Sequence, residues 1–168
     1  MKKWITVLLT VCMLAGCSAS SDQSLEVEKY ESYYAVVEEN VEFAESSSYF
    51  SISAEMSSLP DGTYRYYIFI DEPRTAMYDI TAIAIDQNSI DESGTKMMPS
   101  IGIFEGKYCM IPDQVNSDAG YVKGLMLSGE TDLPEAQLYI LVEWQDVNRV
   151  KLTREFIHLS VSASDSTD

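Results

Sequence analysis

The stretch FSISAEMSSLPDGTYRYYIFI, residues 50–70, decides the fold. Its first part, Phe50 to Met56, alternates apolar residues with serine and glutamate, which is typical of a β-strand with one dry face. The sequence Leu59-Pro60-Asp61-Gly62 indicates a tight turn, because proline presets φ and glycine permits positive φ. Tyr64 to Ile70 is apolar on both faces, as expected of a central strand. The stretch therefore predicts a β-hairpin.

Strand-like segments continue at short intervals after this hairpin. They are separated by turn and loop signals, and they cover 77–85, 101–104, 108–111, 121–127, 138–144 and 152–161. This number and spacing, with no helical pattern between the strands, favours an antiparallel β-sandwich of immunoglobulin-like size over an α/β fold. We predict a mostly β domain over residues 46–161, followed by an acidic polar tail over 162–168.

One amphipathic helix is predicted before the sandwich, over residues 25–45. Apolar residues recur there at spacings of three and four, with glutamates between them. The apolar stripe consists of Val27, Tyr30, Tyr34, Val37, Val41 and Ala44, with Ser24 as the expected N-cap. The stripe fits packing on the domain or the seam of a short coiled coil. Because it is shorter than three heptads, packing on the domain is favoured.

The first residues have the pattern of an export signal. Lys2 and Lys3 precede the apolar run from Trp4 to Leu14, which is shorter than the roughly 20 residues a helix needs to cross a bilayer. Leu14-Ala15-Gly16-Cys17 resembles the lipobox of bacterial lipoprotein signal peptides. The resemblance to the small lipoproteins of single-membrane bacteria covers residues 1–17 alone. It implies removal of residues 1–16, diacylglycerol on the Cys17 sulfur, and a location on the extracytoplasmic side of the cell membrane.

Composition limits the partners of such a protein. Removal of 1–16 takes away two of the 11 basic residues and none of the 27 acidic ones, so the formal charge falls from −16 to −18. A chain this acidic does not suit nucleic acid or anionic lipid headgroups, which both attract basic surfaces. Residues 17–24 are small and polar and predict a flexible tether. The expected contacts are the membrane, through the lipid, and an envelope protein or wall component.

The sequence contains no recognisable catalytic motif and indicates no cofactor. His158 is the single histidine, which rules out a histidine-rich metal site, and Cys109, which would be the one unmodified cysteine of the mature chain, is expected to be a buried core residue. Oxygen ligands for calcium could come from one polar loop. The candidates there are Asp86, Asn88, Asp91 and Glu92.

Tyrosines supply the remaining candidates. The chain has 11 tyrosines, a residue type enriched at protein interfaces because it joins apolar area to a hydrogen-bonding tip. Tyr49, Tyr108 and Tyr121 lie near predicted strand ends and are the expected interaction residues. The sequence therefore favours a lipid-anchored binding or accessory module. The alternatives are an envelope enzyme that uses carboxylates and a calcium-dependent adhesion domain.

Overall fold

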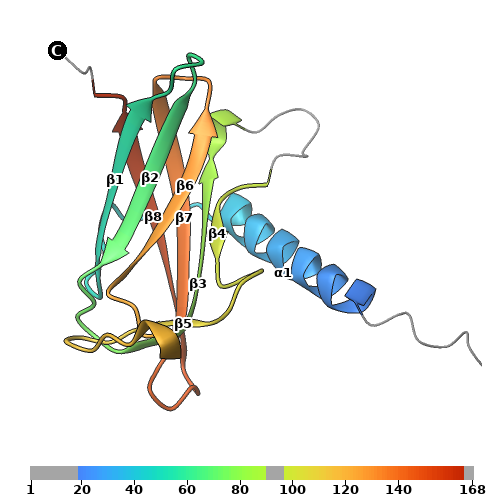
Figure 1. Cartoon of the computed structure of the whole chain (residues 1–168), viewed down its shortest axis with the longest axis vertical. Helices are drawn as coiled ribbons and strands as arrows, with labels where there is room; N and C mark the ends of the chain where they lie inside the picture. Colours follow the sequence, from blue (N-terminus) through green and yellow to red (C-terminus); the bar gives the residue numbers. More distant parts are fainter. Residues whose placement is uncertain (1–18, 90–96, 165–168) are drawn as a thin grey trace, which may run out of the picture.

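The computed structural model describes residues 19–89 and 97–164. Helix α1 precedes all strands, and two short 3-10 helices, η1 and η2, follow β3 and β5 (Figure 1). The bounds are α1 Ala19–Glu39, β1 Ser51–Ser58, β2 Tyr64–Asp71, β3 Met77–Asp86, η1 Gln87–Ser89, β4 Ser100–Ile101, β5 Tyr108–Met110, η2 Ser117–Ala119, β6 Gly124–Thr131, β7 Glu135–Gln145 and β8 Leu152–Ser162.

The strands form two antiparallel sheets packed face to face, which confirms the predicted β-sandwich. One sheet has the order β1-β2-β6, and the other has the order β4-β3-β7-β8 with β5 paired to β3. The predicted hairpin forms as β1-β2, and its register places Ser58 opposite Tyr64 and Ser51 opposite Asp71. Figure 1 shows the β1-β2-β6 sheet lying across the longer one.

The main core lies between the two sheets. The inward residues of β2 and β6 meet those of β3 and β7, and aliphatic side chains dominate. The most deeply buried members include Ile68, Ile70, Ile80, Leu138 and Ile140, each exposed by 1% or less. Burying such side chains is the main term that stabilises a domain of this size, because each contributes about 2 kcal/mol.

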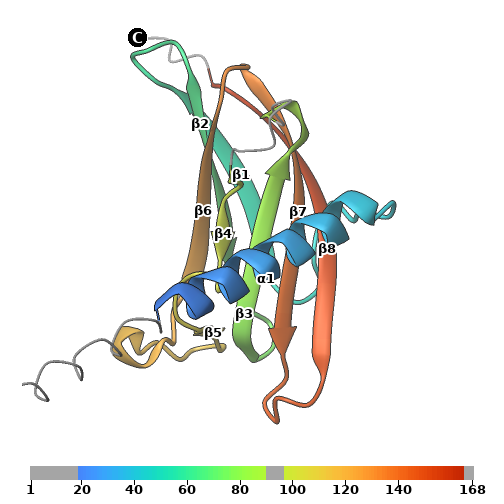
Figure 2. The same ribbon diagram turned by 90° about the vertical axis from the view of Figure 1, so that its right-hand side faces the viewer.

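Helix α1 adds a third layer on the outer face of the β3-β7 sheet, as Figure 2 shows. Tyr30 and Val37 are buried there against Ile83, Ile85 and Leu141 in a second apolar cluster. The helix therefore packs on the domain, which is the favoured of the two predicted arrangements.

The predicted bounds and stripe of this helix are wrong in part. The helix begins at Ala19 and ends at Glu39, so Ser24 lies inside it and the predicted tether is helical from residue 19. Val41 lies beyond the helix and is 91% exposed. The chain leaves the helix at this point because it turns to the edge of β8, where the Ala44 N–H donates to the Phe156 carbonyl over 2.9 Å. Phe43 then packs edge-on against Tyr139 and Phe156.

Two strand predictions also need correction. The strand predicted over 101–104 ends at Ile101, because Gly102 has a φ of +74° and passes so close to the Ile80 carbonyl that a Cβ would overlap it. The strand predicted over 121–127 begins at Gly124 and runs to Thr131. The strand therefore continues four residues past its predicted end, because β6 extends along the whole length of β2.

Candidate interaction surface

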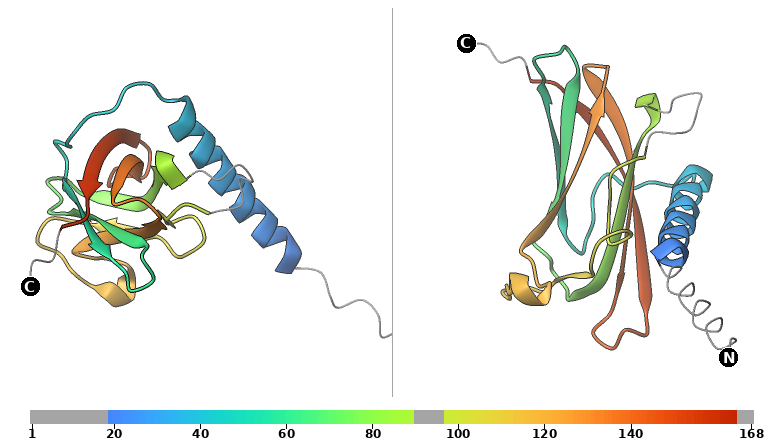
Figure 3. Two further views of the ribbon diagram at one scale, coloured as in Figure 1. Left: turned by 90° about the horizontal axis from the view of Figure 1, so that it is seen from above. Right: turned by 45° about the vertical axis from the view of Figure 1, so that its right-hand side comes forward.

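The outward face of the β1-β2-β6 sheet carries aromatic side chains with no element of the described residues packed over them. We call it the aromatic face. In register across the three strands it consists of Ser51, Asp71 and Gly124, then Ser53, Phe69 and Met126, then Glu55, Tyr67 and Ser128, then Ser57, Arg65 and Glu130. The views in Figure 3 show α1 on the other side of the sandwich. Side chains at alternate positions of a strand share one face, so the inward neighbours of these residues belong to the core.

Tyr67, Phe69 and Met126 form the centre of this face, which we call the aromatic patch. The rings of Tyr67 and Phe69 lie 6.5 Å apart between centroids, with an angle of 21° between their planes. Both residues are half-buried, whereas Met126, directly opposite Phe69, is 53% exposed. Aromatic residues, methionine and arginine are the types enriched in the buried centres of protein interfaces. The patch therefore has the composition of an interface centre.

A charged pair closes one end of the patch. The Arg65 guanidinium donates to Glu130 Oε1, with Nε 3.1 Å from that oxygen, across the β2-β6 pair. The Glu130 hydrogen bond, and after it that of Tyr67, raise the pKa of Arg65 above its ordinary value. Since both partners are substantially exposed, the pair adds little to stability and instead fixes the arginine beside the patch.

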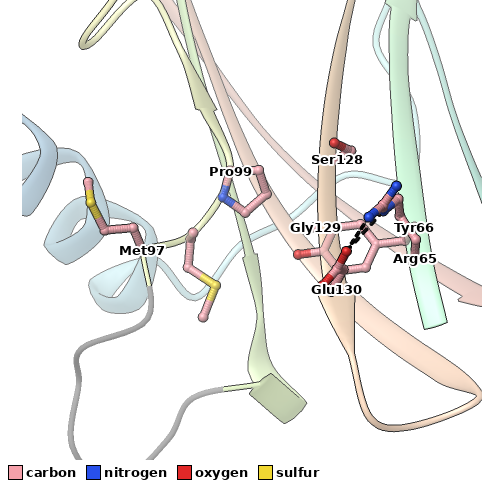
Figure 4. Close-up of a pocket in the computed structure, with 8 residues that line it drawn as sticks. Arg65, Tyr66, Met97, Pro99, Ser128, Gly129 and Glu130 are labelled. Carbon is pink, nitrogen blue, oxygen red and sulfur yellow. Dashed lines mark hydrogen bonds and ion pairs between the residues drawn. The ribbon is translucent and has the colours of Figure 1, made fainter. Parts of the chain in front are cut away.

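The inward side behind this pair is closely packed. Tyr66 lies opposite Gly129, and its ring covers the glycine so closely that a Cβ there would overlap the tyrosine hydroxyl. Burial, followed by the nearby charge of Asp86, raises the pKa of Tyr66. A cavity of about 310 Å³ lies beside them, between Ser128–Glu130 and the segment 97–99 (Figure 4). The cavity opens next to the Arg65–Glu130 pair, at the edge of the aromatic face.

The opposite outer face is covered and its polar groups are paired. Glu143, 6% exposed, accepts hydrogen bonds from the Tyr33 hydroxyl of α1 and from Arg154 Nε of β8. Burial and then the hydrogen bond to Glu143 raise the pKa of Tyr33 to about 12. Lys29 Nζ donates to the Gly102 carbonyl over 2.7 Å. These contacts fix α1 to the sheet, so this face is occupied by the chain itself.

The three predicted interaction tyrosines lie at one end of the sandwich, but they do not belong to the aromatic face. Tyr49 is 39% exposed, and its ring meets Trp144 edge-on at 5.3 Å. Tyr108 is half-buried against the main core, and Tyr121 is half-buried with its backbone bridged to Cys109 and Asn116. Their role in binding stays a prediction.

The calcium candidates are placed in part. Asp86 is fully buried at the end of β3, and its Oδ1 accepts the Asn88 N–H over 3.1 Å. The Asn88 side chain is exposed, and Asp91 and Glu92 lie outside the described residues. Over 19–89 and 97–164, no three acidic, histidine or cysteine side chains gather as a metal ion would require. The calcium prediction as a whole is not tested.

The structure also places the cysteine and the histidine that the sequence analysis singled out. Cys109 is buried and forms no disulfide, which confirms it as a core residue. His158 lies on β8, stacks on Tyr139 and is 2.9 Å from Gln137 Oε1 through its Nε2. Cys17 lies outside the described residues. Among the residues that the structure describes, no helix has both the length and the apolar character needed to cross a membrane.

Sequence reasoning missed the aromatic patch because Tyr64 to Ile70 was interpreted as buried on both faces. The signal lay in the partner strand. A hairpin turning at Leu59–Thr63 pairs Tyr67 with Glu55 and Phe69 with Ser53. Polar partners on the same face mark that face as solvated.

Comparisons with known proteins leave the function open. No protein-family model matches the chain, and no curated protein matches it. A solved structure described as the X-ray structure of Northeast Structural Genomics Consortium target SoR45 is similar over 74% of this chain and 94% of its own, with 12% identity and a TM-score of 0.39. At that level the likeness adds nothing to the fold or the function.

Proposed function

We propose that the chain is an extracytoplasmic lipoprotein, held on the membrane by lipid on Cys17, whose β-sandwich is a binding module for an envelope protein. The aromatic face makes the contact. The observation that carries the proposal is the aromatic patch of Tyr67, Phe69 and Met126, which is solvent-facing in a domain whose other outer face is covered by α1.

The position of α1 supports this arrangement. The helix begins two residues after Cys17, so almost no linker separates the proposed lipid from the helix. Because α1 lies on one outer face and the patch on the other, the patch is on the side of the domain away from the anchored helix (Figure 2). Two or three acyl chains give a durable anchor, since each buried methylene contributes about 0.8 kcal/mol.

Anchoring is tested by expressing the full chain in a bacterium that processes lipoproteins and feeding it an alkyne-labelled fatty acid. We expect label on the wild-type protein in the membrane fraction. The Cys17→Ala variant should carry no label. A wild-type protein that stays unlabelled, with residues 1–16 still attached by mass spectrometry, would contradict the anchor.

Binding is tested with a photo-crosslinking amino acid placed at position 69, in the patch, or at position 41. Val41 is 91% exposed and lies outside the aromatic face, so it is the matched control. We expect a discrete protein adduct from position 69 that Tyr67→Ser abolishes, and none from position 41. Equal adducts from both positions, or an adduct insensitive to Tyr67→Ser, would rule out the patch as the contact.

A further inference from the structure

The aromatic face carries an uneven set of charges. Its outward positions include Glu55, Arg65, Asp71 and Glu130. Arg65 and Glu130 neutralise each other, and no ion pair within the described residues involves Glu55 or Asp71. The patch is therefore flanked by two carboxylates that are in no ion pair, although the Arg74 guanidinium donates to the hydroxyl of Ser51, which lies opposite Asp71.

These two carboxylates lie close to the rings. Glu55 is directly opposite Tyr67 in the β1-β2 register, and Asp71 is two residues along β2 from Phe69, on the same face. Asp71 is half-buried and Glu55 is exposed. A guanidinium or ammonium group placed here can lie over a ring face and pair with a carboxylate at once, and both interactions favour a cation.

The negative charge of the whole chain also favours a cationic partner. A formal charge of −16, or −18 without residues 1–16, attracts cationic partners at long range and repels acidic ones. It also repels a second copy of this chain, whose face would present the same carboxylates. Complementary charge around an apolar centre governs the choice of partner and the rate of encounter.

We propose that the partner of the aromatic face is a basic protein surface, with arginine or lysine side chains around an apolar centre that covers Tyr67, Phe69 and Met126. Glu55 and Asp71 receive the cations and the patch receives the apolar centre. This inference rests on the proposed binding function and names the chemistry of its partner.

The test uses the full lipidated chain in non-ionic detergent micelles and a fluorescent peptide of alternating arginine and leucine, with binding followed by anisotropy. The same peptide with glutamate in place of arginine is the charge-reversed probe. We expect the arginine peptide to bind, with an affinity that falls as salt is raised, and the glutamate peptide to show no binding.

Two double variants with equal net charge separate a site from general attraction. Glu55→Gln with Asp71→Asn removes the flanking carboxylates, whereas Glu28→Gln with Glu31→Gln removes two exposed acids from α1. We expect the first pair to weaken the arginine peptide about tenfold and the second about twofold or less, because the lost contacts are worth about 1.4 kcal/mol. Circular dichroism of each variant checks that the fold is kept.

Equal weakening by the two pairs would overturn the proposal, because attraction would then be spread over the acidic surface. Binding of the glutamate peptide would overturn it as well. So would a dimer in sedimentation that Phe69→Ser dissociates, since the face would then receive a second copy. If position 69 crosslinks to a partner while the arginine peptide fails, the binding function stands and the basic partner is wrong.

Discussion

The two outer faces of the sandwich differ in what lies on them, although both carry large apolar side chains. The face of β3 and β7 presents Ile83, Ile85 and Leu141, and α1 covers all three. The face of β2 and β6 presents Tyr67, Phe69 and Met126, which no described element covers. The covered face joins aliphatic side chains to Tyr139 and Phe156, and Phe43 packs on both rings. The uncovered face leaves two rings and a thioether without such a cover, and this composition is typical of an interface centre.

The comparison predicts unequal stability effects, and the largest belongs to the covered face. Leu141 is fully buried beneath α1, so Leu141→Ala removes apolar contacts and leaves a cavity. We expect a loss of about 3 kcal/mol in the free energy of unfolding, measured by urea denaturation. Val147→Ala, at a residue 64% exposed in the β7-β8 turn, is the control and should change little. A loss below about 1 kcal/mol for Leu141→Ala would mean that α1 does not pack here as described.

A second effect separates the inner side of the β1-β2-β6 sheet from its outer side. In Gly129→Ala the new methyl group overlaps the hydroxyl and ring of Tyr66, so the buried tyrosine must shift. We expect about 2 kcal/mol of destabilisation, as for other overpacked cores. Gly106→Ala, where nothing lies within 4 Å of the added Cβ, is the matched control and should be close to neutral. If the two variants unfold at the same urea concentration, Tyr66 does not lie over Gly129.

The third effect tests the polar contact that holds α1. Tyr33→Phe removes the hydrogen bond to Glu143, and we expect a loss of about 1 kcal/mol at neutral pH. Because the pKa of Tyr33 is raised from 10.0 to about 12, the folded state holds this proton more tightly than the unfolded state. The contribution of Tyr33 to wild-type stability should therefore be constant below about pH 10 and fall as the pH rises from there through about 12.

The Tyr33→Phe variant should show a shallower fall over that pH range. The fall will not vanish, because burial also raises the pKa of Tyr30, Tyr34 and Tyr66. Denaturation curves at pH 9 and pH 11 measure the difference. Parallel losses in wild type and variant would show that Tyr33 does not contribute to the pH dependence.

The two faces also show how far the sequence predicts this molecule. Alternation and turn chemistry are local, so the hairpin of β1 and β2 and the sandwich class could be predicted from residues 50–70 and the strand spacing. Helix bounds depended on a distant contact, the docking of residue 44 on β8. Residues that bear on function were hardest to predict, because Tyr67 and Ile68 look alike in a sequence. Which of them is buried follows from the pairing of β2 with β1, whose polar residues lie opposite Tyr67 and Phe69, and that pairing is not visible in β2 alone.

The smallest loss of stability is expected for a substitution on the uncovered face. Its size relative to Leu141→Ala tests directly whether the two faces differ in role. Phe69→Thr puts a β-branched residue in the strand and removes a half-buried ring that stacks with Tyr67 and lies opposite Met126. We expect about 0.5 kcal/mol of lost stability, the worth of a cross-strand contact, together with loss of partner binding. If Phe69 served the packing of the domain instead, its substitution would cause a large loss of stability. Urea denaturation of Phe69→Thr beside Leu141→Ala decides between these, because equal losses would place Phe69 in the core and remove the reason for assigning this face to a partner.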